Sequence, residues 1–116
     1  MRTSFKTAGV VIKGTRQGVK LGFPTANIVL LTDAPSGIYA GKTTLNGNVY
    51  PSAIYIGPDR KLLETHLIDF SQEIYNQKIS VQVDKKIREV IRFDNYDDLI
   101  AAIHEDIAQV KKFYRL

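Results

Sequence analysis

Residues 37–56 read GIYAGKTTLNGNVYPSAIYI, two β-rich runs on either side of one Asn-Gly pair. Asn46-Gly47 is the kind of dipeptide that best tolerates the positive φ angles of a tight hairpin turn. The flanking runs, 37–45 and 49–56, are rich in β-branched and aromatic residues, which favour strands. This stretch therefore predicts a β-hairpin in the middle of the chain.

Downstream of the hairpin, the pattern remains strand-like and then becomes helical. Residues 62–70 and 78–87 predict two further strands, joined by a turn at 71–76. From residue 94 onward the apolar residues follow a three-and-four spacing, which places one apolar stripe on a helix. The stripe consists of Leu99, Ile100, Ile103, Ile107, Val110 and Tyr114. Asn95 can cap this helix, so its start is well specified.

Upstream of the hairpin, the apolar residues 10–12 predict a strand, and a second extended segment begins at Pro24. About six short strands followed by one helix with a single apolar stripe indicate a β-dominated α+β fold. We expect a closed or nearly closed antiparallel barrel, with the helix packed on its outside.

Composition bounds the function classes. A chain of 116 residues suits one domain, which we expect to span 1–116. The absence of cysteine excludes disulfides and thiol chemistry. No segment has the length of an apolar membrane span, so we expect a cytoplasmic protein without a membrane partner. The basic residues, with a net charge of +4, are dispersed, so we expect a monomer that binds no nucleic acid.

Residues 14–28, GTRQGVKLGFPTANI, form the most unusual stretch of the chain. Glycines let backbone amides approach an anion, and the arginine and lysine add positive charge, so this loop could hold a phosphate. The candidate nucleotide-binding residues are Gly14, Arg16, Gly18, Lys20, Gly22, Pro24, Thr25 and Asn27. Thr25 and Asn27 share one face of the extended segment, and their neutral oxygens suit Mg²⁺. The alternative is that both satisfy backbone groups in a turn.

Glu64 and His66 share one face of the predicted strand 62–70, while Leu63, Thr65 and Leu67 share the other. Glu64 is a candidate general base, because partial burial would raise its pKa toward working pH. The alternative is an exposed surface glutamate. His66 could orient Glu64, contact a substrate or be structural, and no second ligand stands near it at metal-binding spacing.

An ordered series of motifs resembles the riboflavin kinase family over nearly the whole chain. The series is LGFPTANI at 21–28, GIY at 37–39, ETH at 64–66, DF at 69–70, IY at 74–75, then Ile87-Arg88 to Phe93 and a helix containing Asp106. The resemblance implies a six-stranded Greek-key barrel. It also implies transfer of the γ-phosphate of ATP to the terminal ribityl hydroxyl of riboflavin, which gives FMN.

The resemblance also implies roles for single residues. Thr25 and Asn27 would hold Mg²⁺ with the ATP phosphates, and Glu64 would be the base that activates the ribityl hydroxyl. The nucleotide would lie under the first loop and the isoalloxazine near the C-terminal helix. The implied flavin contacts are His66, Arg88 and Phe93.

Three features depart from the family pattern. The usual Gly-Arg-Gly of the first loop reads Arg16-Gln17-Gly18, and the longer flap of the relatives is cut to Pro58-Asp59-Arg60-Lys61. No nucleotidyltransferase segment precedes the kinase motifs, so we expect only the kinase step on this chain.

Two rival functions stay open at this point. One is a noncatalytic flavin- or nucleotide-binding module that kept the barrel and lost turnover with its flap. The other is a barrel for single-stranded nucleic acid, which would need exposed aromatic residues along a groove. We expect Tyr39, Tyr50, Tyr55 and Phe70 mostly to enter the core instead.

Overall fold

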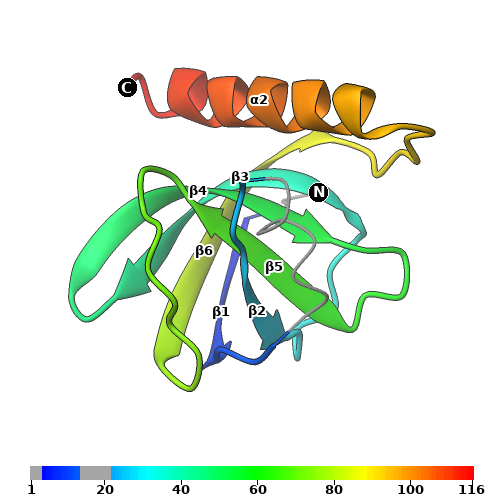
Figure 1. Ribbon diagram of the computed structural model, residues 1–116. Helices are drawn as coiled ribbons and strands as arrows, with labels where there is room; N and C mark the ends of the chain where they lie inside the picture. The colour runs from blue at the N-terminus through cyan, green and yellow to red at the C-terminus, as the bar shows by residue number, and fades with distance from the viewer. Residues whose placement is uncertain (1–3, 14–21) are drawn as a thin grey trace.

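The computed structural model describes residues 4–13 and 22–116. Six strands, all paired antiparallel, form one curled sheet, and one long helix follows them (Figure 1). The strands are β1 (Phe5–Val10), β2 (Ala26–Val29), β3 (Gly37–Leu45), β4 (Asn48–Ile56), β5 (Leu62–Leu67) and β6 (Lys78–Arg88), and the helix is α2 (Tyr96–Phe113). Within the described part of the chain, no helix is long and apolar enough to cross a membrane.

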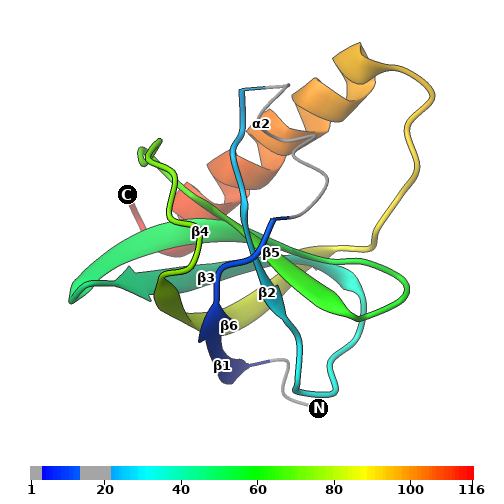
Figure 2. The same ribbon diagram turned by 60° about the horizontal axis from the view of Figure 1, so that its bottom comes forward.

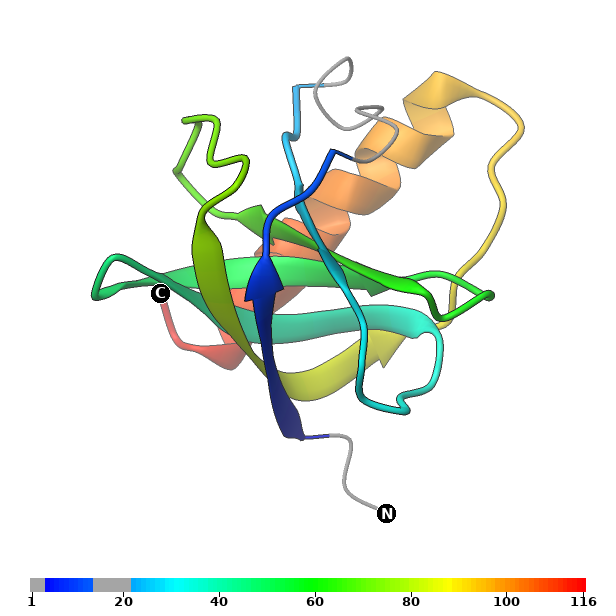
Figure 3. The ribbon, with the colours of Figure 1, turned by 90° about the horizontal axis from the view of Figure 1, so that it is seen from below.

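The strand order is β1-β6-β3-β4-β5-β2. The consecutive strands β3, β4 and β5 are neighbours, and β6 returns to lie beside β3, which makes a Greek key. The backbone N–H of Ile12 donates to the carbonyl oxygen of Asn27 at 2.8 Å, which joins the β1 end of the sheet to the β2 end. Seen from below, the strands enclose a nearly closed barrel with α2 on its far side (Figure 3). The predicted barrel with an external helix is confirmed.

The central hairpin forms as predicted. Asn46 and Gly47 have φ angles of 51° and 82°, so both central residues of the turn adopt the positive φ of a tight hairpin connection. Two predicted strands have different bounds in the structure. The strand predicted over 62–70 ends at Leu67, because Asp69 has a φ of 62° that turns the chain. β1 begins earlier than the predicted run 10–12. Its side chains alternate between exposed and partly buried, so its sequence carries only a weak strand signal.

The core lies inside the barrel and is built from alternate residues of each strand. Its fully buried side chains include Ile28, Tyr39, Ile54, Ile56, Leu63, Val81 and Val83. Three buried hydroxyls also face inward: Thr43 and Thr65 lie 2.8 Å apart, and Ser52 donates to Thr43 at 2.9 Å. These hydrogen bonds satisfy polar groups that would otherwise be costly to bury.

Helix α2 packs on the outer face of β3 and β4. Val110, fully buried, contacts Ala40 and Ile68 in a small second core between helix and barrel. The Asn95 side chain accepts the N–H of Asp98 at 2.9 Å, so the predicted cap is confirmed. The segment after β6 runs around the end of the helix to its first turn (Figure 2). The helix therefore covers one part of the outer wall of the barrel.

Candidate active site

A row of side chains crosses the outer face of the barrel on five adjacent strands. The paired positions are Arg88 with Ile38, Ile38 with Tyr55, Tyr55 with Glu64, and Glu64 with Asn27. Directly opposed residues in antiparallel strands point to the same side of the sheet. We call this set, Arg88-Ile38-Tyr55-Glu64-Asn27, the outer row. It brings together residues that are far apart in the sequence.

A cavity of about 460 Å³ lies between the outer row, of which all residues but Asn27 line it, the segment after β6 and the first half of α2. We call it the outer cavity. Leu99 and Ile103 of the helix line one side of it, and Tyr55 and Glu64 of the sheet line the other. The predicted flavin contacts His66, Arg88 and Phe93 all line this cavity.

Glu64 lies beside Thr25 in the outer cavity. The Thr25 hydroxyl donates to the Glu64 carboxylate at 3.3 Å. Burial raises the pKa of Glu64, and the hydrogen bond from Thr25 lowers it by a smaller amount. A raised proton affinity of this kind favours a general-base role for a carboxylate. The structure therefore places the side chains of Glu64 and Thr25 in contact.

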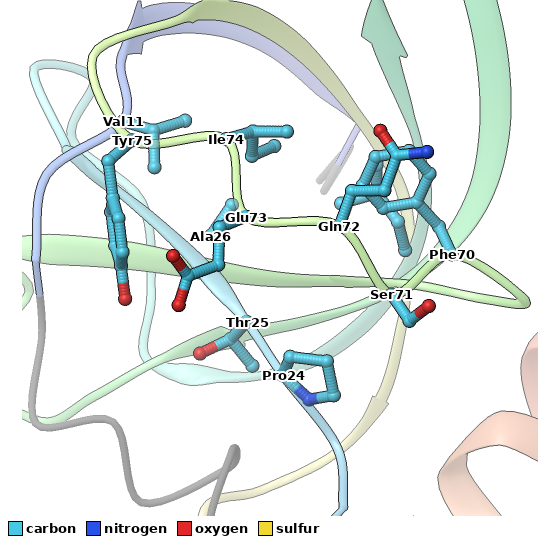
Figure 4. A pocket seen from close by; sticks show the side chains of 11 residues that line it. Val11, Pro24, Thr25, Ala26, Phe70, Ser71, Gln72, Glu73, Ile74 and Tyr75 are labelled. Atoms are coloured by element: carbon cyan, nitrogen blue, oxygen red, sulfur yellow. The ribbon is translucent and has the colours of Figure 1, made fainter.

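A second cavity, of about 270 Å³, lies on the other side of Thr25 (Figure 4). We call it the loop-side cavity, since it lies between Pro24, Ala26 and the connection 70–75. The side chains of Thr25, Glu73 and Tyr75 reach into it (Figure 4). Thr25 lines both cavities, so the two cavities adjoin this residue.

His66 holds the segment that leads into β2. Its Nδ1 lies 2.8 Å from the carbonyl oxygen of Pro24. A carbonyl only accepts hydrogen bonds, so Nδ1 carries a proton and donates it to Pro24. The ring of Phe23 contacts His66 at 5.9 Å and His104 of α2 at 5.1 Å between ring centres, both edge-on. His66 thus positions Pro24, next to Thr25. The contact of Phe23 with His104 was not predicted from the sequence.

Arg88 is held by the helix. Its Nε and Nη2 donate to the two carboxylate oxygens of Asp106, each at 2.8 Å, and Nη1 donates to the carbonyl oxygen of Glu89 at 3.1 Å. The ring of Phe93 lies 5.8 Å from the guanidinium. Arg88 therefore joins β6 to α2 as well as lining the cavity. The sequence signal for Asp106 is a carboxylate within the apolar stripe, three residues after Ile103 and four before Val110.

Asn27 is buried and is the cross-strand neighbour of Glu64. Among the described residues there is no cluster of three or more histidine, cysteine, aspartate or glutamate side chains that could hold a metal alone. The oxygen atoms of Thr25 and Asn27 are nevertheless hard ligands, which suit Mg²⁺ when substrate phosphates supply the remaining charge. The donor set thus fits a magnesium-nucleotide complex.

Part of the predicted nucleotide site lies outside the described residues. These are Gly14, Arg16, Gly18 and Lys20. Gly22 is described, is exposed and has a φ of 86°, a value that favours glycine. Pro24 lines the loop-side cavity together with Thr25.

The expectation that the aromatic residues Tyr39, Tyr50, Tyr55 and Phe70 mostly enter the core holds for three of the four. Tyr39 is fully buried, and Tyr50 and Phe70 pack partly buried against the core, as expected. Tyr55 instead faces outward and lines the outer cavity, because its neighbours Ile54 and Ile56 take the inward positions of β4.

The sequence over residues 1–114 matches a family described as Flavokinase, riboflavin kinase. The chain belongs to the riboflavin kinase family. A bifunctional riboflavin kinase/FMN adenylyltransferase from Haemophilus influenzae is 38% identical over 95% of this chain. A protein from Bacillus subtilis named RNA-binding riboflavin kinase RibR is 38% identical over 94% of it.

The riboflavin kinase fold is also found in a solved structure. The crystal structure of riboflavin kinase from Trypanosoma brucei has a TM-score of 0.77, covers 97% of this chain and 78% of its own, and is 23% identical. The curated relatives are longer than this chain, which spans 39% of the Haemophilus protein and 51% of the Bacillus protein.

Proposed function

We propose that residues 1–116 form a riboflavin kinase domain that transfers the γ-phosphate of ATP to the terminal ribityl hydroxyl of riboflavin, giving FMN. One observation carries the proposal: Thr25 lines both cavities and donates to Glu64. A hydroxyl ligand and a base therefore lie where two substrates, one in each cavity, would meet. Family membership supplies the identity of the substrates.

Riboflavin occupies the outer cavity in this proposal. The cavity volume of about 460 Å³ falls within the range of small-molecule sites. Leu99 and Ile103 offer an apolar wall to a flat ring system, and His66 and Phe93 add ring edges. With the isoalloxazine near α2, the ribityl chain extends toward Glu64 and the junction of the two cavities.

ATP occupies the loop-side cavity, with its phosphates toward Thr25. Pro24 and the residues 70–75 form the wall of this cavity. In the sequence, the predicted phosphate-binding residues of the first loop come just before Pro24. This arrangement presents the γ-phosphate to the acceptor at the end where the cavities meet, as in-line transfer requires.

Glu64 acts as the base in the transfer. Its carboxylate takes the proton of the terminal ribityl hydroxyl, and the freed oxygen forms a bond to the γ-phosphorus. The bond between that phosphorus and the β,γ-bridging oxygen breaks, and ADP leaves. The raised pKa of Glu64 favours this role, because it brings the proton affinity of the carboxylate closer to neutral pH.

Thr25 and Asn27 would hold Mg²⁺ in this scheme. When bound, the ion neutralises charge on the transferring phosphates. Thr25 can donate its proton to Glu64 and still offer an oxygen lone pair to a cation, so its hydrogen bond does not conflict with this role. Asn27 lies beside Glu64 on the neighbouring strand.

A noncatalytic binding module is the less favoured alternative. Such a module has no use for a carboxylate in a partly buried site, where ionisation is costly. We also propose that the domain is a cytoplasmic monomer without a nucleic-acid partner. RNA binding stands in the name of the Bacillus relative, and this chain spans only 51% of that protein.

The test is product formation from defined substrates. The protein is incubated with riboflavin, Mg²⁺ and ATP labelled on the γ-phosphate, and the flavins are separated by chromatography. We expect labelled FMN, and we expect its formation to stop when EDTA removes the metal. Riboflavin binding without any FMN would instead establish the noncatalytic module.

A matched control uses a second glutamate. Glu105 is an exposed residue of α2 whose carboxylate accepts a hydrogen bond from Gln109 at 2.9 Å. Glu105→Gln removes the same charge as Glu64→Gln and should leave FMN formation unchanged. Equal losses in the two variants would show that net charge, not the base, governs the rate.

A further inference from the structure

Tyr55 stands next to the proposed base. It is the cross-strand partner of Glu64 on one side and of Ile38 on the other, in the middle of the outer row. Its ring lines the outer cavity on the sheet side. From the sequence, Tyr55 was expected only to pack in the core. Its outward position instead makes it available to a ligand in the outer cavity.

The phenol end of Tyr55 lies against the start of the turn that joins β4 to β5. A Cβ atom added to Gly57 would come within 3.2 Å of the Tyr55 hydroxyl oxygen. The turn consists only of residues 57–61, and none of these lines the outer cavity. On this side of the cavity Tyr55, and not the short turn, therefore forms the wall.

The chemistry of the wall suits a planar aromatic ligand. Across the cavity, Leu99 and Ile103 present aliphatic side chains from α2. Burial first, and then the charges of Glu64 and Asp59, raise the pKa of Tyr55, so its phenol stays neutral at physiological pH. A neutral aromatic ring can stack in an offset manner on a flat ring system at a favourable distance.

We propose that Tyr55 is a substrate-contacting residue that selects a planar aromatic acceptor by packing its ring against the isoalloxazine. The inference rests on the proposed function, since it places riboflavin in the outer cavity. It goes further by naming the side chain that forms the cavity wall beside the short turn. The contact is made with the ring system and not with the ribityl chain.

The test compares three substitutions at one position. Tyr55→Phe keeps the ring, Tyr55→Leu keeps apolar bulk without the ring, and Tyr55→Ala removes both. Binding of riboflavin and of lumiflavin, the ring system without the ribityl chain, is measured by flavin fluorescence. We expect Tyr55→Phe to bind both within about twofold of the parent and Tyr55→Leu to bind both about three- to tenfold more weakly. Thermal unfolding of each variant reports whether the fold is kept.

A kinetic measurement separates substrate contact from structural damage. Tyr55→Leu should raise KM for riboflavin by the factor found in binding and keep kcat within about threefold of the parent, because the ring contact is made in both ground and transition states. A fall in kcat with an unchanged KM would overturn the assignment. So would equal riboflavin binding by Tyr55→Leu and the parent.

Gly57→Ala gives an independent test, since the added methyl group presses on the Tyr55 hydroxyl and shifts the ring. In the parent, this substitution should weaken lumiflavin binding by at least about twofold. In the Tyr55→Leu background it should have no effect, because the atom it presses on is gone. The same loss in both backgrounds would show that Gly57 acts without Tyr55 and would overturn the inference.

The outcome for Tyr55 is separable from that for the proposed function. Failure of the parent protein to form FMN refutes the kinase proposal. FMN formation by the parent, together with parent-like lumiflavin binding by Tyr55→Leu, refutes only the role of Tyr55.

Discussion

Glu64 and Thr65 are consecutive residues of β5, yet they lie in opposite environments. Thr65 points into the barrel, is fully buried and shares a hydrogen bond with Thr43 at 2.8 Å. Glu64 points outward, lines a cavity and accepts a hydrogen bond from Thr25. The inner hydroxyls satisfy one another, whereas the outer carboxylate keeps capacity for a ligand.

The comparison shows how one strand serves stability and function together. Alternation of side chains assigns every second residue of β5 to each face. Polar groups on the inner face must be paired within the protein, because no ligand reaches them. Polar groups on the outer face form the site, because a cavity lies between them and helix α2.

The largest expected effect comes from the outer face. Glu64→Gln should lower kcat for FMN formation by about 10²–10⁴-fold, because it removes the proposed base and keeps the size of the side chain. The neighbouring Thr65→Val should leave kcat per folded molecule within about twofold of the parent, since the altered atom faces the core. Steady-state kinetics on both variants measure the contrast. Comparable losses of kcat would break the division between the two faces.

Thr25→Ala should follow, with a loss of about 10²-fold in kcat. The substitution removes the hydroxyl that lies at the junction of the cavities and donates to Glu64. It should also raise the Mg²⁺ concentration needed for half-maximal rate, which a metal titration measures. Thr25→Ser keeps the hydroxyl and serves as control. An unchanged metal requirement in Thr25→Ala would exclude Thr25 as a ligand.

A smaller effect is expected where the helix is held over the outer row. In Arg88→Lys, a single ammonium group replaces the guanidinium that donates two hydrogen bonds to the Asp106 carboxylate. The ammonium group cannot match this paired geometry. We expect the free energy of unfolding to fall by about 1–3 kcal/mol, which denaturant titration measures. Lys85→Arg, at an exposed site of β6, is the matched control. Unchanged stability in Arg88→Lys would mean that apolar packing alone holds the helix.

On the inner face, Thr65→Val should lower the free energy of unfolding by about 1 kcal/mol. The side chains have nearly the same shape, so the change isolates the hydroxyl that lies 2.8 Å from Thr43. The double variant Thr43→Val with Thr65→Val removes both partners and should be less destabilised than the sum of the single variants. Additive losses would show that the two hydroxyls do not depend on each other.

The smallest effect is a pH-dependent difference in stability. Because the pKa of Glu64 is raised above its ordinary value of 4.5, the folded state binds its proton more tightly than the unfolded state. This contribution to stability is complete below pH 4.5 and is lost as pH rises through the pKa of the folded protein. At neutral pH, Glu64→Gln should therefore melt at a higher temperature than the parent. A gap in Tm that widens as pH falls would contradict the raised pKa.

Much of the fold could be predicted because its signals are local. The positive φ angles of Asn46 and Gly47 are a property of the turn dipeptide, and the cap at Asn95 depends on residues within one helical turn. The faces of Glu64 and Thr65 follow from alternation alone. β1 was located poorly, since a strand exposed on every second residue carries a weak signal.

The site was predicted as a set of residues but not as an arrangement. Glu64 and Thr25 could be named from motifs, whereas their 3.3 Å contact depends on how β2 pairs with β5. Arg88 was expected to touch the flavin, and its two-bonded contact to Asp106 requires knowing where α2 lies. The outward position of Tyr55 could have been predicted by extending alternation from Ile54 and Ile56.

The sequence by itself determined the hairpin, the terminal helix, the face of each β5 residue and the kind of chemistry that the motifs permit. These follow from dihedral preferences and periodicity, which act over a few residues. Only the tertiary structure decided the outer row, the meeting of the two cavities at Thr25 and the partner of Arg88. Strand register and helix docking fix these features, and both depend on packing between segments that are distant in the chain.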